Sequence, residues 1–461
     1  MRKWVIPIGV VALVAAALLI LGGRVRRDRF GNAPERFILI VIDSLRADHV
    51  GCYGSSKDLT PNIDAFAAGG VRFADAFSVA PHTFGSNSGL FTGRYPHEVR
   101  ALRGMRLANE AVTLAECFAA QGYETAAFSS HFIISRQCNF NQGFKWLLQQ
   151  DRQDDAMVER CRRWLARHRD DRYFVLLYLW DPHLPYRAKD LSPELQAKCA
   201  KVRASVAKGW PPLAPDIRRP KLTPNPSNDA ECSPLEVEVL HELYDGAVRQ
   251  ADQRVGRVLE AIGAAPRTVV ALLSDHGEEF LDHGGLRHKL TLYRELLHVP
   301  FIIRAPRETQ RVTDTPVSNL DLMPTLLALA GIPQPGGVKG QPVFDDFGPR
   351  PVFAEAGYSL ESEIYRYCVR LDAGALIYSV KDLPREPPIP AGGMWEYYDL
   401  RRDPRQQAPG TLESAPAHLR CLLTRYRADT ARRLEPYLKQ QPELPDRQTL
   451  EKLRTLGYVG D

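Results

Sequence analysis

The stretch that decides the fold is Glu35–His49, ERFILIVIDSLRADH, because it joins an apolar run to a carboxylate. It contains five consecutive apolar residues, Phe37 to Val41, the pattern of a strand that is covered on both faces. The run ends at Asp43, so we expect a carboxylate at the carboxyl edge of this strand. Ligands of open α/β sheets bind beyond that edge, which makes Asp43 the first candidate site residue.

Strand and helix patterns alternate after this stretch. Residues 62–77 and 113–130 each have the pattern of a helix, a turn and a strand. Further buried strands are expected within residues 172–186, 268–280 and 298–306. This alternation predicts an α/β fold in which a mostly parallel central sheet has helices on both faces.

The pattern changes after about residue 346. Residues 364–380 and 395–404 have the alternation of antiparallel strands, and residues 418–441 have the pattern of an amphipathic helix with an arginine-rich outer face. We expect a smaller C-terminal subdomain with an antiparallel sheet and a helix. Seven prolines between Gly209 and Pro234 argue against regular structure there. That insertion fits a lid or rim loop as well as a passive surface loop.

The N-terminus differs from the rest of the chain. Residues Trp4 to Gly23 are uncharged and mostly apolar, about the length that crosses a bilayer as a helix, and arginines follow them. We expect an uncleaved membrane anchor with the catalytic domain in the periplasm or outside the cell; a cleaved signal peptide is the alternative. Four units are predicted: an anchor (residues 1–23), a basic linker (24–35), a catalytic domain that includes the insertion (36–345), and the C-terminal subdomain (346–461).

Charge and cysteine content exclude some functions. The chain has 461 residues and a net charge of only +5, without a tract basic enough to indicate nucleic-acid binding. Its eight cysteines form no CxxC pair, so they do not indicate a zinc site.

Three predicted strands end in polar groups that meet at one edge of the sheet. These are Asp43, the pair Asp181 and His183, and the pair Asp275 and His276. Carboxylate and imidazole ligands from separate strands suit a divalent cation, Mn²⁺, Ca²⁺ or Mg²⁺, with Zn²⁺ also compatible. The alternative for Asp275 and His276 is a hydrogen-bonded strand end with a helix cap.

Several blocks resemble, in order, those of the sulfatases in the alkaline phosphatase superfamily. The resemblance begins at about Arg36 and reaches the C-terminus. It includes VIDSLRADHVGCYG, LFTGRYP, WDPHLPY, SDHGEEFLDHG, KLTLYRELLHVP and NLDLMPTLLALAGIP. The resemblance implies an alkaline-phosphatase-like mixed central sheet between helices, a smaller C-terminal sheet with a helix, and one divalent metal ion.

The resemblance also assigns roles to residues. Asp43 matches the family's first metal-binding aspartate, and Asp275 and His276 match its second metal pair. Lys289 matches the lysine that holds the substrate's anionic oxygens, and His183 matches a histidine that contacts substrate or assists the leaving group. Without the resemblance, Lys289 also fits a solvated helix residue and His183 a turn residue.

The chain departs from the family at the reactive residue. The signature Cys-x-Pro-Ser-Arg is matched here by residues 83–87, TFGSN, so Thr83 replaces the cysteine and Asn87 replaces the arginine. Threonine cannot be converted to formylglycine, and Ser44 replaces a carboxylate that many sulfatases have. The set Asp43, Thr83, Asp275 and His276 is similar to the ligands of threonine-dependent phosphoethanolamine and phosphoglycerol transferases.

We therefore predict a metal-dependent hydrolase of the sulfatase family that acts on a sulfate or phosphate ester through a metal-bound Thr83 nucleophile. Asn87, His183 and Lys289 are the expected substrate contacts, and the substrate is an anionic ester of a glycan or a lipid head group. One alternative is a transferase that passes a phosphorylated head group to a cell-envelope acceptor. Another is an inactive sulfatase-like protein that binds an anionic glycan, and a third makes Thr83 an ordinary helix N-cap.

Overall fold

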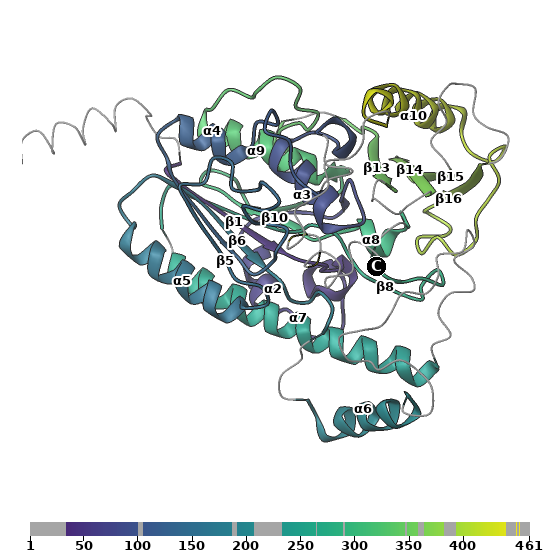
Figure 1. The fold of residues 1–461 in the computed structure, drawn as a ribbon, viewed down its shortest axis with the longest axis horizontal. Coiled ribbons are helices and arrows are strands. Elements are labelled where there is room, and N and C mark those ends of the chain that lie inside the picture. Colours follow the sequence, from purple (N-terminus) through teal and green to yellow (C-terminus); the bar gives the residue numbers. More distant parts are fainter. Residues whose placement is uncertain are drawn as a thin grey trace, which may run out of the picture.

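A computed structural model of the chain describes residues 34–99, 105–186, 191–206, 233–263, 265–288, 291–345, 348–357, 364–381, 393–438, 449 and 451. Its centre is an eight-stranded sheet in the order β11-β2-β10-β7-β1-β6-β4-β5 (Figure 1). These strands are β1 (Arg36–Ile42), β2 (Val71–Phe73), β4 (Glu124–Ser129), β5 (Trp146–Gln149), β6 (Tyr173–Leu179), β7 (Thr268–Ser274), β10 (Phe301–Arg304) and β11 (Arg311–Thr313).

The register of the central strands positions the predicted site. Strands β7, β1, β6, β4 and β5 are parallel, whereas β10 is antiparallel to β7, so the predicted mixed, mostly parallel sheet is confirmed. Ile42 at the end of β1 lies opposite Leu179 of β6 and Ser274 of β7. Because the strands end level, Asp43 and Asp275 follow at the same height on neighbouring strands.

Helices cover both faces of this sheet (Figure 1). Alternate residues of β1 enter different cores: Phe37, Leu39 and Val41 pack in one core, and Ile38, Ile40 and Ile42 pack in the other. The first core lies under α3 (Thr83–Thr92), α4 (Leu114–Ala120) and α9 (Leu322–Ala330). The second lies under α2 (Pro61–Ala67), α5 (Asp154–Arg167) and α7 (Pro234–Ile262). Burial on both faces explains the unbroken apolar runs in the sequence.

The described helix α6 (Pro193–Val206) packs against α7, and residues 209–232 of the proline-rich insertion lie outside the described residues. The last residue of that insertion, Pro234, is helical, contrary to the expectation. Ser233 caps α7 by accepting a hydrogen bond from the Glu236 backbone N–H, and Pro234 is the first helical residue. Proline suits that position because its missing N–H would have no partner within the helix.

A separate antiparallel sheet follows in the C-terminal part of the chain, as predicted. It consists of β13 (Val352–Ala356), β14 (Ile364–Leu371), β15 (Gly374–Lys381) and β16 (Met394–Asp399). One face packs under α10 (Ala417–Leu438), and the other packs against Phe77 and α8 (Arg294–Leu297). The domain boundary at residue 346 stays a prediction. The remaining short elements are β3 (Ala76–Phe77), β8 (Glu279–Phe280), β9 (Leu286–Arg287), β12 (Val317–Ser318), η1 (Ala47–His49), η2 (Gly51–Tyr53), η3 (Pro96–Glu98) and η5 (Asn319–Asp321).

The predicted membrane-anchored localisation is corrected by the helices of the structure. In the part of the chain that the structure describes, no helix combines the length and the apolar composition needed to cross a bilayer. The segment Trp4–Gly23, on which the prediction depended, lies outside the described residues. The prediction of a membrane anchor is therefore not retained.

Candidate active site

Two buried carboxylates form the floor of the site. Asp43 and Asp275 extend from the level ends of β1 and β7, and neither is exposed. Ser44 has a left-handed backbone, φ 58°, and it donates two hydrogen bonds, from Oγ to Asp43 Oδ1 at 2.7 Å and from its backbone N to Asp275 Oδ1 at 3.2 Å. Burial, and then the nearby Asp275 carboxylate, raise the pKa of Asp43 well above its usual value.

His276 places a third electron-pair donor beside these two carboxylates. Its Nδ1 lies 2.8 Å from the carbonyl oxygen of Gly277, so Nδ1 carries the proton and Nε2 has a lone pair. That Nε2 lies 3.7 Å from Asp43 Oδ1 and 3.5 Å from Asp275 Oδ2. Electron-pair donors that converge in a buried place repel one another unless a cation lies between them. The residues therefore fit a divalent cation, and the donor set of oxygens with one imidazole matches the cations expected from the sequence.

Thr83 lies beside this group at the start of α3. Its Oγ1 is 3.2 Å from His276 Nε2, and the side chain is fully buried. The N-cap of α3 is His82, whose Nδ1 accepts the backbone N–H of Gly85 at 3.1 Å, so the interpretation of Thr83 as the N-cap is wrong. Gly85 is required here because a Cβ would lie 2.7 Å from the His82 ring.

Asn87 and Tyr178 orient the carboxylates. Asn87 Nδ2 lies 3.0 Å from Asp275 Oδ2 and 2.8 Å from the carbonyl oxygen of Thr83. The Tyr178 hydroxyl lies 2.7 Å from Asp275 Oδ2 and 3.2 Å from Asp43 Oδ2. The expected substrate contact of Asn87 stays a prediction. Sequence reasoning missed Tyr178, although its position was a usable signal: it places a hydroxyl one residue before the end of a strand that otherwise consists of apolar and aromatic residues.

Removing the Tyr178 hydroxyl should weaken cation binding. We expect Tyr178→Phe to bind Mn²⁺ about 10- to 100-fold less tightly, because groups that orient a metal ligand typically have effects of that size. Isothermal titration with Mn²⁺ measures the change. Tyr244→Phe is the control, since that buried hydroxyl donates to the Ser44 carbonyl oxygen and has no contact with a carboxylate of the site. Equal affinities in Tyr178→Phe and the wild type would contradict this role.

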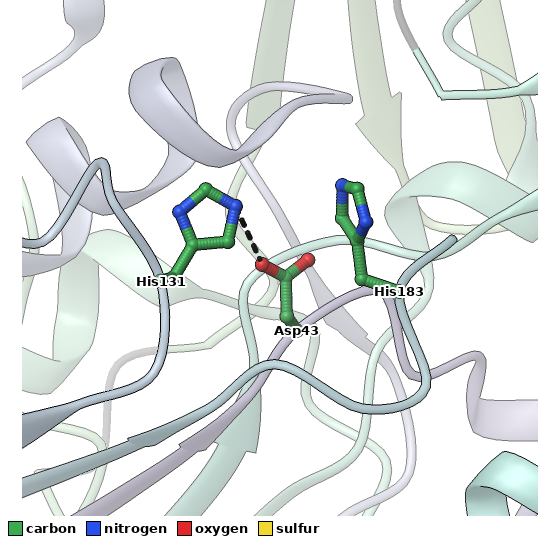
Figure 2. A group of neighbouring side chains, drawn as sticks. All are labelled: Asp43, His131 and His183. Carbon is green, nitrogen blue, oxygen red and sulfur yellow. Dashed lines mark ion pairs between the residues drawn. The ribbon is translucent and has the colours of Figure 1, made fainter. Parts of the chain in front are cut away.

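Two histidines lie on either side of the Asp43 carboxylate (Figure 2). His131 follows β4, and its Nδ1 accepts the backbone N–H of Ile133 at 3.0 Å, so Nε2 carries the proton and faces Asp43 Oδ2 at 3.4 Å. His183 follows β6 and has the opposite tautomer, because its Nδ1 donates to the Leu184 carbonyl oxygen at 2.5 Å. Among the described residues, the buried Nε2 of His183 has no hydrogen-bond partner. Burial, and then a neighbouring histidine, lower the pKa of both rings.

These tautomers assign different roles to the two rings. Asp43, His131 and His183 are close enough together to hold a cation. However, His131 offers Asp43 an N–H rather than a lone pair, so the three residues do not fit a second cation site. We interpret His131 as the donor that fixes Asp43, and the open lone pair of His183 as a proton acceptor. Sequence reasoning missed His131 because its predicted segment ended at Ser130, one residue too early.

The remaining predicted residues are arranged as follows. Asp181 forms an ion pair with Arg254 of α7 and is not part of the group formed by Asp43, Asp275 and His276. Lys289 lies outside the described residues, so its role stays a prediction. His288, the residue before it, was also missed; its Nδ1 lies 2.9 Å from Glu278 Oε1, and its ring centre is 4.3 Å from that of His276 and 4.8 Å from that of His183.

Comparison with known proteins assigns the family. A model of the sulfatase family matches residues 35–332. The chain is 25% identical to an uncharacterized sulfatase of Escherichia coli (strain K12) over 376 residues, which cover 71% of this chain and 74% of that protein. The solved structure of a 2-O GAG sulfatase is similar with a TM-score of 0.67 and 20% identity, covering 89% of this chain and 95% of the other. The phosphonate monoester hydrolase of Agrobacterium radiobacter gives a TM-score of 0.63 and 19% identity, covering 88% and 96%. The chain belongs to the sulfatase family.

Proposed function

We propose that this protein is a cation-dependent hydrolase of phosphorus esters that uses Thr83 as its nucleophile. The observation that carries the proposal is the buried Thr83 hydroxyl, 3.2 Å from His276 Nε2 and beside the Asp43–Asp275 pair. A threonine there excludes the formylglycine chemistry of a sulfatase. The structural similarity to a phosphonate monoester hydrolase supports a substrate that contains phosphorus.

The residues of the site suggest two displacement steps. A divalent cation held by Asp43, Asp275 and His276 would lower the pKa of the Thr83 hydroxyl and offset the charge of the carboxylates. In the first step Thr83 Oγ1 forms a bond to phosphorus, the bond from phosphorus to the ester oxygen breaks, and the leaving alcohol takes up the proton that the hydroxyl gives up. In the second step water attacks phosphorus, the Oγ1–P bond breaks, and Thr83 regains a proton.

His183 is the side chain best suited to carry these protons. Its Nε2 has a lone pair and a buried position beside Asp43, and it has no hydrogen-bond partner in the part of the chain that the structure describes. Burial keeps the ring neutral by lowering its pKa, so Nε2 can accept a proton from the attacking water. Lys289, if it adopts the role that the family resemblance implies, would share the charge of the transferred group.

A sulfate ester should trap the enzyme after one turnover. Phosphothreonine can be attacked in line by water, whereas sulfothreonine is a plain alkyl sulfate without an easy exit. With Mn²⁺ present, we expect repeated turnover of 4-nitrophenyl phosphate, phosphodiester or phosphonate esters, and at most one nitrophenol per protein from 4-nitrophenyl sulfate. Stopped-flow absorbance measures the burst, and peptide mass spectrometry locates the added group on Thr83. Sustained sulfate ester turnover without turnover of any phosphorus ester would reject the proposal.

A further inference from the structure

The hairpin formed by β8 and β9 connects two histidines of the site. It begins three residues after His276 and ends directly before His288. Its two strands pair with Glu279 opposite Arg287 and Phe280 opposite Leu286. The position of His288 relative to His276 therefore depends on how this hairpin is held.

One side of the hairpin tip is held by the loop after β1. Arg46, three residues beyond Asp43, donates to both carboxylate oxygens of Asp282, from Nη1 at 2.9 Å and from Nη2 at 3.2 Å. The same guanidinium donates to the Glu278 carbonyl oxygen at 3.1 Å. These contacts connect the tip to the strand that supplies the first carboxylate.

The other side of the tip is held through His283. Its Nδ1 lies 2.6 Å from Glu295 Oε1 of α8, and its Nε2 lies 2.7 Å from the carbonyl oxygen of Gln406. Because both nitrogens face acceptors, both carry protons and the ring is positively charged. Burial acts to lower the pKa of His283, but the hydrogen bond and charge of Glu295, the hydrogen bond to Gln406 and the charge of Glu279 together outweigh it, and the pKa is raised to about 9. The ring also stacks on Tyr293, with ring centres 3.7 Å apart.

Gln406 connects this contact to the C-terminal sheet. It is fully buried and has a left-handed backbone, φ 56°. Its Oε1 accepts a hydrogen bond from Arg370 Nη2 of β14 at 3.0 Å, and the same Nη2 donates to the Leu292 carbonyl oxygen at 3.3 Å. The next residue, Gln407, donates from Nε2 to the Asp282 carbonyl oxygen at 3.2 Å. Two consecutive residues thus hold the tip.

We propose that His283 and Gln406 are positioning residues: they form a clamp through which the C-terminal sheet holds the β8–β9 hairpin and sets His288 against His276 and His183. The catalytic part of this inference rests on the proposed function. The clamp should loosen when His283 loses its charge, because a neutral imidazole donates only one of the two hydrogen bonds.

The charged and titratable groups that face His283 come from three sides. Glu279 of β8 has its pKa raised to about 7 by burial and by the Glu295 carboxylate of α8. The Tyr293 phenol lies against the ring and donates to Glu396 of β16 at 3.0 Å. Above about pH 7 ionised Glu279 adds its charge to the hydrogen bond with Glu295, and both favour the charged ring. Loosening is therefore expected as the pH rises through about 9, where His283 itself titrates.

Hydrogen exchange and kinetics of His283→Ala test the clamp in the full-length protein with Mn²⁺ bound. We expect exchange of the amides of residues 279–288 to rise about tenfold, and kcat for a phosphorus ester to fall about 10- to 100-fold, because a displacement of about 1 Å can reduce a rate that much. KM and the Mn²⁺ affinity should change less than about threefold, since the proposed ligands stay in place. In the wild type the protection factors of the same amides, which are corrected for base-catalysed intrinsic exchange, should fall above pH 9. The control is His418→Ala, an exposed histidine on α10.

Each outcome decides a different part of the inference. Unchanged exchange at residues 279–288 would reject the clamp whatever the activity does. Faster exchange with an unchanged kcat would leave a structural contact and reject the positioning role. If the wild type hydrolyses no phosphorus ester, the proposed function fails, and the exchange rates and their pH dependence still decide the clamp. If His283→Ala does not fold, Gln407→Ala is the milder test: it keeps His283 but removes an exposed side chain that holds the tip at the Asp282 carbonyl oxygen and also contacts His283 and the Arg405 carbonyl oxygen, so exchange at residues 279–288 should still rise, and unchanged exchange would reject the clamp.

Discussion

Thr83→Ala is expected to lower kcat by roughly three or more orders of magnitude while leaving substrate affinity within a few-fold of the wild type. Without Oγ1 the chain has no atom in this position that can form the bond to phosphorus. Thr83→Ser should keep part of the activity because a hydroxyl remains. Initial rates with a 4-nitrophenyl ester of phosphorus, measured at saturating Mn²⁺, test both variants.

The stability of Thr83→Ala should change little, because the cap of α3 is the His82 ring and not Thr83. Thr92→Ala is the matched control. Thr92 is a buried threonine at the other end of the same helix, and its hydroxyl donates to the Ser88 carbonyl oxygen at 2.6 Å. That variant should lose about 1 kcal/mol of unfolding free energy with its rate intact. A fully active Thr83→Ala enzyme would refute Thr83 as the nucleophile.

Asp43→Asn is expected to be at least as stable as the wild type when no cation is bound, and less stable than the wild type when the cation is present. In a chelator the variant should be at least as stable as the wild type, because the substitution removes one of two buried carboxylates that repel each other. With Mn²⁺ in excess the wild type should become more stable, by about 2.7 kcal/mol at one hundred times its dissociation constant. The variant should lose this gain together with its activity. Thermal unfolding with EDTA and with Mn²⁺ measures both effects.

Asp252→Asn provides the contrast. Asp252 of α7 is also buried, and burial likewise raises the pKa of its carboxyl group. Its carboxylate, however, accepts the backbone N–H groups of Asn62 and Ile63 at the start of α2. Asp252→Asn should therefore be less stable than the wild type with and without Mn²⁺, and its stabilisation by Mn²⁺ should be normal. An equal Mn²⁺ shift in Asp43→Asn would remove Asp43 from the cation site.

The inner strands of the central sheet were predictable because they are buried on both faces, whereas the edge strands β5 and β11 are half-buried or exposed and were not predicted. The apolar run of β1 predicts a strand, and the change to a carboxylate predicts where that strand ends. The sequence of β7 has the same pattern. Parallel register then places Asp43 beside Asp275. The two pattern segments of the C-terminal sheet were likewise visible because their sequences alternate, although β14 and β15 are buried on both faces, one under α10 and the other against Phe77 and α8.

The contacts that fix the side chains were not predictable in the same way. The hydrogen bond from His283 to Gln406 joins residues 123 positions apart, and neither residue lies in a periodic pattern. The N-cap of α3 was not predicted, because histidine is an uncommon cap and Thr83 was the only side chain considered for that position. The tautomers of His131 and His183 depend on backbone groups in the loops that follow β4 and β6, and strand patterns carry no information about those groups.

The separation of the reactive hydroxyl from the carboxylates has an engineering consequence. Thr83 stands at the first turn of a helix, whereas Asp43 and Asp275 are placed by backbone pairing between β1 and β7. Inserting one residue into either strand would shift its carboxylate by about 3.3 Å and invert the facing of the side chains before it, so indel libraries there should yield no active clones. Saturation of position 83 leaves that frame untouched. Substitution of the nucleophile Thr83 is therefore the practical way to change the leaving groups that this fold can displace.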